Sequence, residues 1–241
     1  MILEQGDCLE LMKKIPDHSI DMILCDLPYG TTACNWDVII SFDELWEQYN
    51  RVAKENACIA LFATEPFASK LRLSNLKDYK YDLYWQKEKA TNFLQVKKRF
   101  GKTTENICIF YKKQCTYNPQ KYTVDYRVNN KPKDKSNSSI TAAIGFKVKA
   151  YEDDGTRYPN DILKFNRVPL GKTLHETQKP VELLEYLIKS FTNEGDTVLD
   201  NCMGSGSTGV ACRNLNREFI GFELNEDYFK IAKNRILNNF E

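Results

Sequence analysis

The chain has 241 residues and a formal net charge of +1; 42% of its residues are hydrophobic and 28% are charged. That length is sufficient for one large α/β domain with a small insertion, and it is short for two independent domains. No apolar run approaches the roughly 18 residues that a membrane span needs, and the first residues lack the apolar stretch of a signal peptide. We therefore expect a single-domain cytoplasmic protein that does not enter a membrane.

The eight cysteines show no CxxC spacing, and the chain has only two histidines, His18 and His175. Zinc sites usually draw on closely spaced pairs of Cys and His, so we expect no metal ion. The composition is instead typical of reduced cysteines in a cytosolic protein.

The first half of the chain alternates between strand and helix patterns. Short apolar runs bounded by turn residues predict strands, and apolar residues on one helical face, such as Leu45, Tyr49 and Val52, predict helices. The predicted elements are, in chain order, a strand at residues 1–4, a helix at 9–15, a strand at 20–25, a helix at 42–54, a strand at 57–62, a helix at 66–73, and strands at 81–86 and 106–111.

This alternation breaks between residues 115 and 173. The segment is rich in Asn, Lys, Ser, Tyr and Pro without sustained periodicity, and we expect an irregular insertion there. Regular elements return afterwards as a helix at 180–191, a strand at 196–199, a helix at 207–215, a strand at 219–222 and a helix at 227–238. The alternation predicts a doubly wound, mostly parallel seven-stranded sheet in one domain, with the insertion separating residues 1–114 from 174–241.

The positive charge is concentrated in the middle of the chain. Residues 77–149 contain 17 Lys/Arg against 6 Asp/Glu, so the remainder of the chain is acidic. A polyanion would therefore meet this region. A solvated, lysine-rich surface explains the same excess, and the charge alone does not decide between the two.

A glycine-rich loop follows the predicted strand at 196–199, between Asp200 and the helix that begins at Ser207. Gly204 and Gly206 let the backbone turn tightly and approach a ligand, and the helix offers free N–H groups. Glu223, roughly 20 positions further on, can accept hydrogen bonds from ribose hydroxyls. The loop lacks the Lys-Ser/Thr of a P-loop, and it fits a dinucleotide, S-adenosylmethionine or an ordinary β–α turn.

A second loop, reading Asp-Leu-Pro-Tyr, leaves the predicted strand at 20–25, at the edge where open α/β sheets bind ligands. The exocyclic amine of adenine or cytosine is a poor nucleophile because its lone pair is delocalised into the ring. The carboxylate of Asp26 and the main-chain carbonyl of Leu27 can accept its two hydrogens and localise that lone pair for attack on a methyl sulfonium. Pro28 would stiffen the loop, and Tyr29 would stack on a base swung out of the duplex. A turn that contains a proline and an aromatic residue by chance is the alternative.

Together the two loops resemble the β class of DNA amino-methyltransferases, in which a (D/N/S)-P-P-Y tetrapeptide precedes an F-x-G-x-G cofactor loop. The order here is the same, and the similarity covers most of the chain. Gly6 and Asp7 resemble the early GD element of the family, and residues 175–180 resemble its H-x-T-Q-K-P element. Trp85, Lys87 and residues 105–113 resemble later motifs of the catalytic half. Leu27 stands at a position where the family has proline, which leaves the main-chain acceptor in place. Cys202 stands where the family has phenylalanine, which leaves a smaller contact for the cofactor.

The resemblance implies a Rossmann-like methyltransferase that moves a methyl group from S-adenosylmethionine to N6 of adenine in DNA. Adenine is favoured because Asp leads the tetrapeptide, whereas the cytosine-N4 enzymes of the group more often have Ser. The implied catalytic residues are Asp26, Leu27, Pro28 and Tyr29. The implied cofactor-binding residues are Asp7, Cys8, Thr177, Lys179, Pro180, Asp200, Cys202, Gly204, Gly206, Ser207 and Glu223. A cytosine-N4 enzyme, a catalytically silent DNA-binding module of the same fold and a dehydrogenase are the alternatives.

The target-recognition region of the family corresponds to the insertion at 115–173, and the basic excess lies in and just before it. We therefore expect double-stranded DNA as the partner, bound through its phosphates. The residues expected at phosphates are Lys97, Lys98, Arg99 and Lys102. The candidates for reading bases are Asn129, Asn130, Asn137 and Arg157. Residues 30–37 are expected to close over the site. Members of the family are often dimers, so a homodimer is the assembly that the resemblance offers.

Overall fold

The computed structural model describes residues 1–30, 38–124, 154–169, 171 and 178–238. The chain divides into two compact units, one made of Met1–Asn118 with Asn160–Glu241 and the other of Pro119–Pro159. The second unit lies inside the predicted insertion. In its described part, β6 (Tyr122–Thr123) pairs antiparallel with β7 (Thr156–Arg157).

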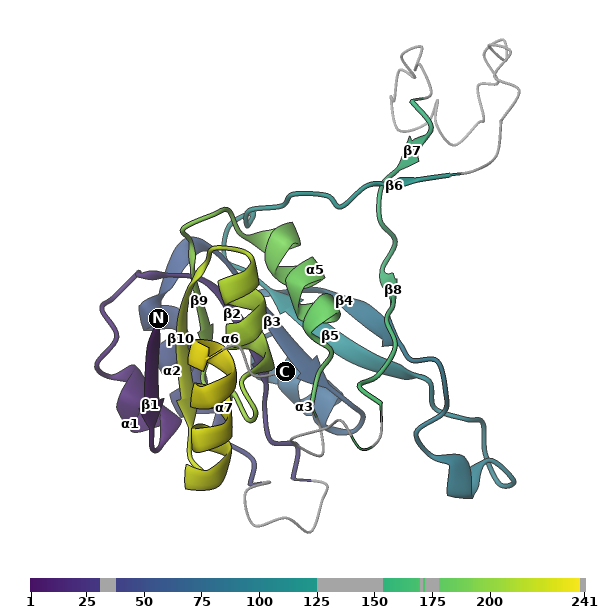
Figure 1. The fold of residues 1–241 in the computed structure, drawn as a ribbon, viewed down its shortest axis with the longest axis horizontal. Coiled ribbons are helices and arrows are strands. Elements are labelled where there is room, and N and C mark those ends of the chain that lie inside the picture. The colour runs from purple at the N-terminus through teal and green to yellow at the C-terminus, as the bar shows by residue number, and fades with distance from the viewer. Residues whose placement is uncertain (31–37, 125–153, 170, 172–177, 239–241) are drawn as a thin grey trace. The chain divides into compact units, whose positions relative to one another are not determined.

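The larger unit is built on an eight-stranded sheet with the order β1-β10-β9-β2-β3-β5-β4-β8 (Figure 1). The strands are β1 (Ile2–Gln5), β2 (Ile20–Asp26), β3 (Ala53–Ala63), β4 (Tyr79–Gln86), β5 (Thr104–Phe110), β8 (Ile162–Lys164), β9 (Thr197–Asp200) and β10 (Glu218–Glu223). All neighbours are parallel except β5, which runs antiparallel to both β3 and β4. The doubly wound, mostly parallel fold is thus confirmed.

The sheet has one strand more than the seven predicted. β8 lies in the stretch that was expected to be irregular, and it pairs in parallel with the end of β4, Tyr84 opposite Ile162. A strand of three residues is too short to show an alternating pattern in the sequence. The strand β8 is therefore defined by its pairing with β4, which is remote in the chain.

Helices cover both faces of the sheet (Figure 1). The helices are α1 (Cys8–Met12), α2 (Phe42–Val52), α3 (Phe67–Ser74), α5 (Val181–Phe191), α6 (Ser207–Asn214) and α7 (Glu226–Asn238). Buried residues of α1, α2 and α3 belong to one hydrophobic core, and those of α5, α6 and α7 belong to another. In α2 the buried face contains Leu45, Tyr49 and Val52, as the helical spacing predicted. Within the described residues, every helix falls short of the length and apolar character that a bilayer span requires.

The central strand β2 is buried on both sides because helices lie above and below it. Met22 and Leu24 face one core, while Ile23 and Cys25 face the other. Each of the Met, Leu and Ile side chains contributes about 1.5–3 kcal/mol of hydrophobic stabilisation. This double burial explains why the strand reads as an unbroken apolar run, and it makes β2 a rigid support for the loop that follows.

The chain reverses its direction across the sheet between β2 and β9. From β2 it continues through α2 to β3 on one side, and from β9 it continues through α6 to β10 on the other. In doubly wound sheets the loops at such a switch point diverge and leave a crevice where ligands bind. The Asp-Leu-Pro-Tyr loop and the glycine-rich loop therefore start from the carboxyl ends of two hydrogen-bonded neighbours, which pair Met22 with Val198 and Ile23 with Leu199.

Candidate active site

Asp26 is the last residue of β2, and the loop that follows folds back onto it. The Tyr29 hydroxyl donates to Asp26 Oδ1 at 2.6 Å and lies 3.1 Å from Glu105 Oε1. The Tyr29 ring packs on Phe67 with a centroid separation of 5.0 Å. The side chain of Leu27 is buried in the core beneath the loop, which ties the loop to the sheet.

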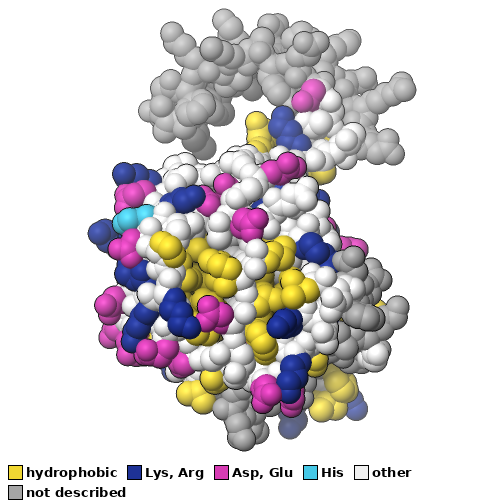
Figure 2. All heavy atoms as spheres, turned by 60° about the vertical axis from the view of Figure 1, so that its left-hand side comes forward, with side chains coloured by type: hydrophobic (Ala, Val, Ile, Leu, Met, Phe, Trp, Pro, Cys, Tyr) yellow, Lys and Arg dark blue, Asp and Glu magenta, His cyan; other side chains and the backbone are white. Residues whose placement is uncertain are grey.

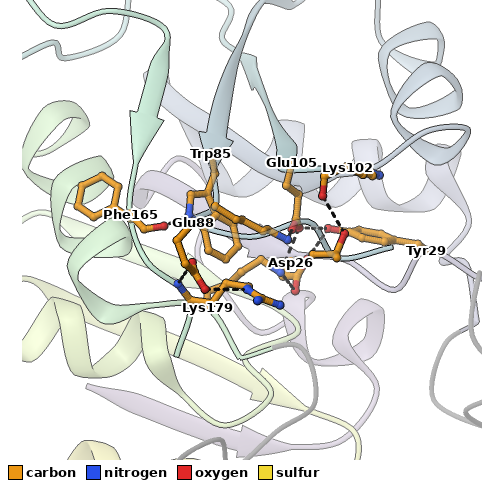
Figure 3. A network of polar contacts seen from close by, with 11 residues as sticks. Asp26, Tyr29, Trp85, Glu88, Lys102, Glu105, Phe165 and Lys179 are labelled. Carbon is orange, nitrogen blue, oxygen red and sulfur yellow. Dashed lines mark hydrogen bonds and ion pairs between the residues drawn. The ribbon is translucent and has the colours of Figure 1, made fainter. Parts of the chain in front are cut away.

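Lys179, Lys87 and Glu105 complete a buried network around Asp26 (Figure 3). Lys179 Nζ donates to Asp26 Oδ2 and lies 3.3 Å from Glu105 Oε1. Lys87 Nζ donates to Glu105 Oε2 at 2.6 Å. Because the side chains of Lys179 and Glu105 are only 8% and 6% exposed, water does little to screen these contacts.

Burial and charge oppose each other in this network, and the charges prevail. Burial raises the pKa of Glu105, but Lys179 and Lys87 outweigh that effect and bring this pKa down to about 2. Burial lowers the pKa of Lys179, but Asp26 and Glu105 more than compensate and leave this pKa raised. Burial and the two nearby carboxylates raise the pKa of Tyr29. Near neutral pH, Glu105 is thus ionised, Lys179 is protonated, and Tyr29 is a neutral hydrogen-bond donor.

Aromatic rings form the base of the network. Lys179 Nζ lies 4.9 Å from the ring centroid of Phe62, and Lys87 Nζ lies 4.4 Å from that of Trp85. The Trp85 indole N–H donates to the main-chain oxygen of Phe165 at 2.8 Å, which fixes the ring. Such rings attract the ammonium groups and partly replace their lost hydration.

The family resemblance marked residues 105–113 together with Trp85 and Lys87, but it gave no individual role to Glu105. Its position at the start of β5 reads as an ordinary strand residue next to an apolar run. The separations of 76 residues from Tyr29 and 18 from Lys87 leave no local pattern to recognise. A buried position for an acidic residue in a strand is the signal that only the structure supplies.

The glycine-rich loop begins at Asp200, which is 3% exposed. Its Oδ2 accepts from Thr208 Oγ1 at 2.6 Å and its Oδ1 from the Cys202 amide at 3.2 Å. Burial raises the pKa of Asp200 to about 6, against the opposing effect of these hydrogen bonds. Gly206 has a φ of 80°, and a Cβ at this position would lie 2.9 Å from Ala232 Cβ on α7. Glycine is therefore required both by the backbone and by the close approach of α7.

Glu223 closes this loop against the end of β10. Its Oε2 accepts from the Gly204 amide at 2.9 Å, and its Oε1 accepts from the Asn225 amide at 2.8 Å. Burial raises the pKa of Glu223, and these amide hydrogen bonds oppose the rise. The carboxylate thus shapes the loop through main-chain contacts in addition to the ribose contact expected for it.

The early GD element lies beside Glu223, because the Gly6 amide donates to the Glu223 main-chain oxygen at 3.0 Å. Asp7 is the N-cap of α1, and its Oδ1 accepts from the amides of Leu9 and Glu10 at 2.9 and 3.2 Å. The cap explains locally why α1 begins where it does. The carboxyl ends of β1, β10, β9 and β2 thus present Asp7, Glu223, Asp200 and Asp26 along one edge of the sheet.

Three cysteines connect the loops of this edge. Hydrogen bonding to Cys202 lowers the pKa of Cys8 against the opposing effect of burial, and Cys202 also lies within hydrogen-bonding reach of Cys25. The three thiols come from the start of α1, from β2 and from the glycine-rich loop. Within the described part of the chain, no group of His, Cys, Asp and Glu side chains is arranged to hold a metal ion.

The remaining predicted site residues fall in several places. Pro180 is the N-cap of α5, directly after Lys179, and Ser207 is the first residue of α6. Lys97, Lys98, Arg99 and Lys102 all lie in the connection between β4 and β5. Arg157 belongs to β7 in the smaller unit. Thr177, Asn129, Asn130, Asn137 and residues 31–37 lie outside the described residues.

The doubly wound sheet, with an acidic loop and a glycine-rich loop at its switch point, is the arrangement of a Rossmann-like methyltransferase. The sequence model of a family described as DNA methylase, which covers N6 and N4 enzymes, matches residues 20–234. The chain belongs to this family of DNA methylases.

Individual relatives match along nearly the whole chain. The type II methyltransferase M.HpaI of Haemophilus parainfluenzae is 30% identical over 98% of this chain and 74% of its own length. The DNA adenine methyltransferase YhdJ of Escherichia coli K12 is 28% identical over 96% of this chain and 81% of its own length. The crystal structure of an M1.HpyAVI–SAM complex is similar with a TM-score of 0.66 and 26% identity, covering 98% of both chains.

Proposed function

We propose that this protein transfers a methyl group from S-adenosylmethionine to the N6 amino group of adenine in double-stranded DNA. The observation that carries the proposal is the placement of Asp26 within a charged network at the end of β2, next to the glycine-rich loop on the adjacent strand β9. Membership of the DNA methylase family supports the reaction class. The adenine specificity stated in the name of YhdJ and the cofactor in the M1.HpyAVI complex support the substrate and the methyl donor.

The chemistry of the sheet edge fits this cofactor. The carboxylates of Asp7, Asp200 and Glu223 suit ribose hydroxyls, an adenine amino group and the positive charge of a sulfonium. S-adenosylmethionine, when bound, supplies an electrophilic methyl group. We propose that it is held by Asp7, Cys8, Thr177, Pro180, Asp200, Cys202, Gly204, Gly206, Ser207 and Glu223. Lys179 was expected at the methionine end, but its contacts with Asp26 and Glu105 support a role at the catalytic loop instead.

The catalytic loop activates the amine by accepting its hydrogens. The Asp26 carboxylate and the Leu27 carbonyl would take one N–H each, which favours a tetrahedral nitrogen with a localised lone pair. Pro28 restricts the backbone between these acceptors and Tyr29, whose ring would stack on the flipped base. The bound cofactor would supply its methyl group to this nitrogen and would leave as a neutral thioether, and the proton that the amine loses would pass to solvent. No covalent bond to the enzyme is needed.

Glu105 lets Asp26 change partners. Both Asp26 oxygens are occupied, one by the Tyr29 hydroxyl and one by Lys179. Because each carboxylate oxygen can accept a second hydrogen bond, an incoming amine either joins these donors or displaces one of them. Glu105 Oε1 lies 3.1 Å from the Tyr29 hydroxyl and 3.3 Å from Lys179 Nζ, so either donor can transfer to it without losing a buried partner. Glu105 and Lys179 are therefore proposed as positioning residues for the acceptor.

The test replaces Asp26 by Ala and uses Asp43→Ala, an exposed acidic position on α2, as the matched control. Each protein is incubated with unmethylated genomic DNA and labelled cofactor, and the DNA is hydrolysed to nucleosides. We expect N6-methyladenine with the parent and the control. Asp26→Ala should bind the cofactor as the parent does and lose methyl transfer by about 100- to 1,000-fold or more.

Three results would redirect the proposal. N4-methylcytosine in the hydrolysate would show a cytosine enzyme, the main alternative. Cofactor binding without methylation of any DNA would favour a silent DNA-binding module. Substantial activity of Asp26→Ala would remove Asp26 from the mechanism. A homodimer stays a prediction, and light scattering on the same preparations measures it.

A further inference from the structure

Residues 88–102, within the connection between β4 and β5, project beyond the sheet as a long hairpin, here named the basic arm (Figure 1). Its stem is closed by the Lys87 amide on the Thr103 oxygen at 2.7 Å and the Thr91 amide on the Lys102 oxygen at 2.9 Å. Further out, the Asn92 side chain bridges the hairpin, accepting from the Lys102 amide at 2.6 Å. The short 3₁₀ helix η1 (Phe93–Gln95) forms the outer part. The arm therefore has a defined, hydrogen-bonded conformation.

The basic arm combines positive charge with exposed apolar side chains. Its cations are Lys89, Lys97, Lys98, Arg99 and Lys102. Its single acidic residue, Glu88, is held by Arg167 at 3.3 Å. Its large apolar side chains are exposed, with Phe93 at 69%, Leu94 at 83%, Val96 at 50% and Phe100 at 99%. The face drawn in Figure 2 also shows hydrophobic side chains, but there acidic and basic side chains are interspersed around them. Apolar groups clustered in this way, with charges around them, mark a binding surface.

The arm starts at the edge of the sheet that holds the candidate active site. β2 and β3 are parallel, and β5 is antiparallel to β3 and β4, so β4 ends and β5 begins at the edge where Asp26 lies. The residues that flank the arm belong to the network, because Lys87 directly precedes the arm, Glu105 follows it in β5, and the two form an ion pair. Glu105 in turn contacts the Tyr29 hydroxyl. A substrate engaged by Asp26 and Tyr29 therefore lies beside the root of the arm.

We propose that the basic arm is a DNA wedge: its cations bind phosphates beside the target, and Phe93, Leu94 and Phe100 enter the base stack where the flipped nucleotide leaves a gap. The inference rests on the proposed function and extends it to how the duplex is opened. Apolar wedges reduce the cost of unstacking in other DNA-bending proteins, and an extrahelical base is what Asp26 requires. Charge favours DNA as the occupant, because the cations of the arm match a row of phosphates and two arms would repel each other; docking on the acidic remainder of a second copy is an outcome that the test detects.

The experiment compares the parent with Phe100→Ala, with the double variant Lys98→Gln/Arg99→Gln, and with the control Leu73→Ala, whose side chain on α3 is 68% exposed. Methyl transfer is measured on native and on heat-denatured genomic DNA. Binding of a labelled random-sequence duplex is measured by fluorescence anisotropy between about 50 and 200 mM salt. Light scattering gives the molar mass of each protein. Because the substituted side chains are exposed, the thermal midpoints should match that of the parent.

If the arm acts as a wedge, the loss of methyl transfer should be larger on double-stranded than on denatured DNA. Phe100→Ala should lower the rate on native DNA about ten-fold relative to denatured DNA, in which the base is already unstacked. The double variant should weaken duplex binding and reduce the salt slope by about one for each phosphate that is no longer bound. The control should change neither quantity.

Three outcomes would overturn the wedge. These are equal losses of Phe100→Ala on both forms of DNA, an unchanged salt slope in the double variant, and a fall in molar mass that accompanies the loss. The last outcome would assign the arm to an interface with a second copy of this chain. If the parent binds the duplex but methylates neither form, the proposed function fails. The salt slope then still decides whether the arm holds DNA.

Discussion

Replacing Glu105 by Gln tests the buried network because the change removes one negative charge and keeps the side-chain size. Glu105 is the acceptor shared by Lys87, at 2.6 Å, and Lys179, at 3.3 Å. The variant leaves Lys87 buried without a carboxylate. It also leaves the Tyr29 hydroxyl and Lys179 with Asp26 as their remaining anion.

The expected loss of stability follows from the pKa of Glu105. The two lysines lower this pKa from 4.5 to about 2 in the folded protein, against burial. That interval corresponds to about 3 kcal/mol at pH 7, which agrees with the cost of breaking a buried ion pair. Because the folded-state pKa is the lower one, this stabilisation is complete above pH 4.5 and is lost as the pH falls towards 2. Urea unfolding of parent and variant between these limits measures it.

The same variant should affect catalysis through Asp26. In the variant the neutral amide oxygen is a weaker acceptor than the carboxylate, so the Tyr29 hydroxyl and Lys179 stay on Asp26 and compete with the substrate amine. We expect kcat to fall about 10- to 100-fold while the dissociation constant of the cofactor changes little. Glu55→Gln, which alters an exposed pair with Lys113, serves as the control and should change neither quantity.

Either of two results would contradict the role of the Glu105 charge. One is an unfolding free energy of Glu105→Gln that equals that of the parent at pH 7. The other is a difference between the two proteins that does not shrink between pH 4.5 and pH 2, since a loss of packing alone would be independent of pH. A fall in cofactor affinity with unchanged kcat would indicate that Glu105 acts at the cofactor site and not through Asp26.

Further substitutions test the two loops. Gly206→Ala should destabilise the protein by about 2 kcal/mol or more in thermal unfolding, because φ is 80° and the new Cβ would lie 2.9 Å from Ala232 Cβ; unchanged stability would contradict this packing. Asp200→Asn should gain stability relative to the parent as the pH rises from about 4 to 6, because burial raises the pKa of Asp200 to about 6 and its ionisation costs the folded state; a flat difference would argue against that burial cost. Tyr29→Phe should keep most of its activity, whereas Tyr29→Ala should lose about ten-fold or more if the ring stacks on the base, and equal losses would assign the effect to the hydroxyl.

The order of elements could be predicted well because the patterns are local. A strand buried on both faces, such as β2, reads as a continuous apolar run, and α2 shows its core face at helical spacing. Both loops follow such elements and carry residues whose conformational or chemical properties are evident from sequence. The ends of elements were less accurate: α1 ends at Met12 rather than at residue 15, and β3 begins at Ala53 rather than at residue 57.

By itself, the sequence determined the fold class, the two loops and their order along the chain, because each depends on residues close together in the sequence. Only the tertiary structure decided which side chains meet. Lys179 and Asp26 are 153 residues apart, and their contact depends on the strand order and on burial that makes an unpaired charge costly. The same holds for Glu105, which becomes a shared acceptor only when β5 is placed beside β3 and β4.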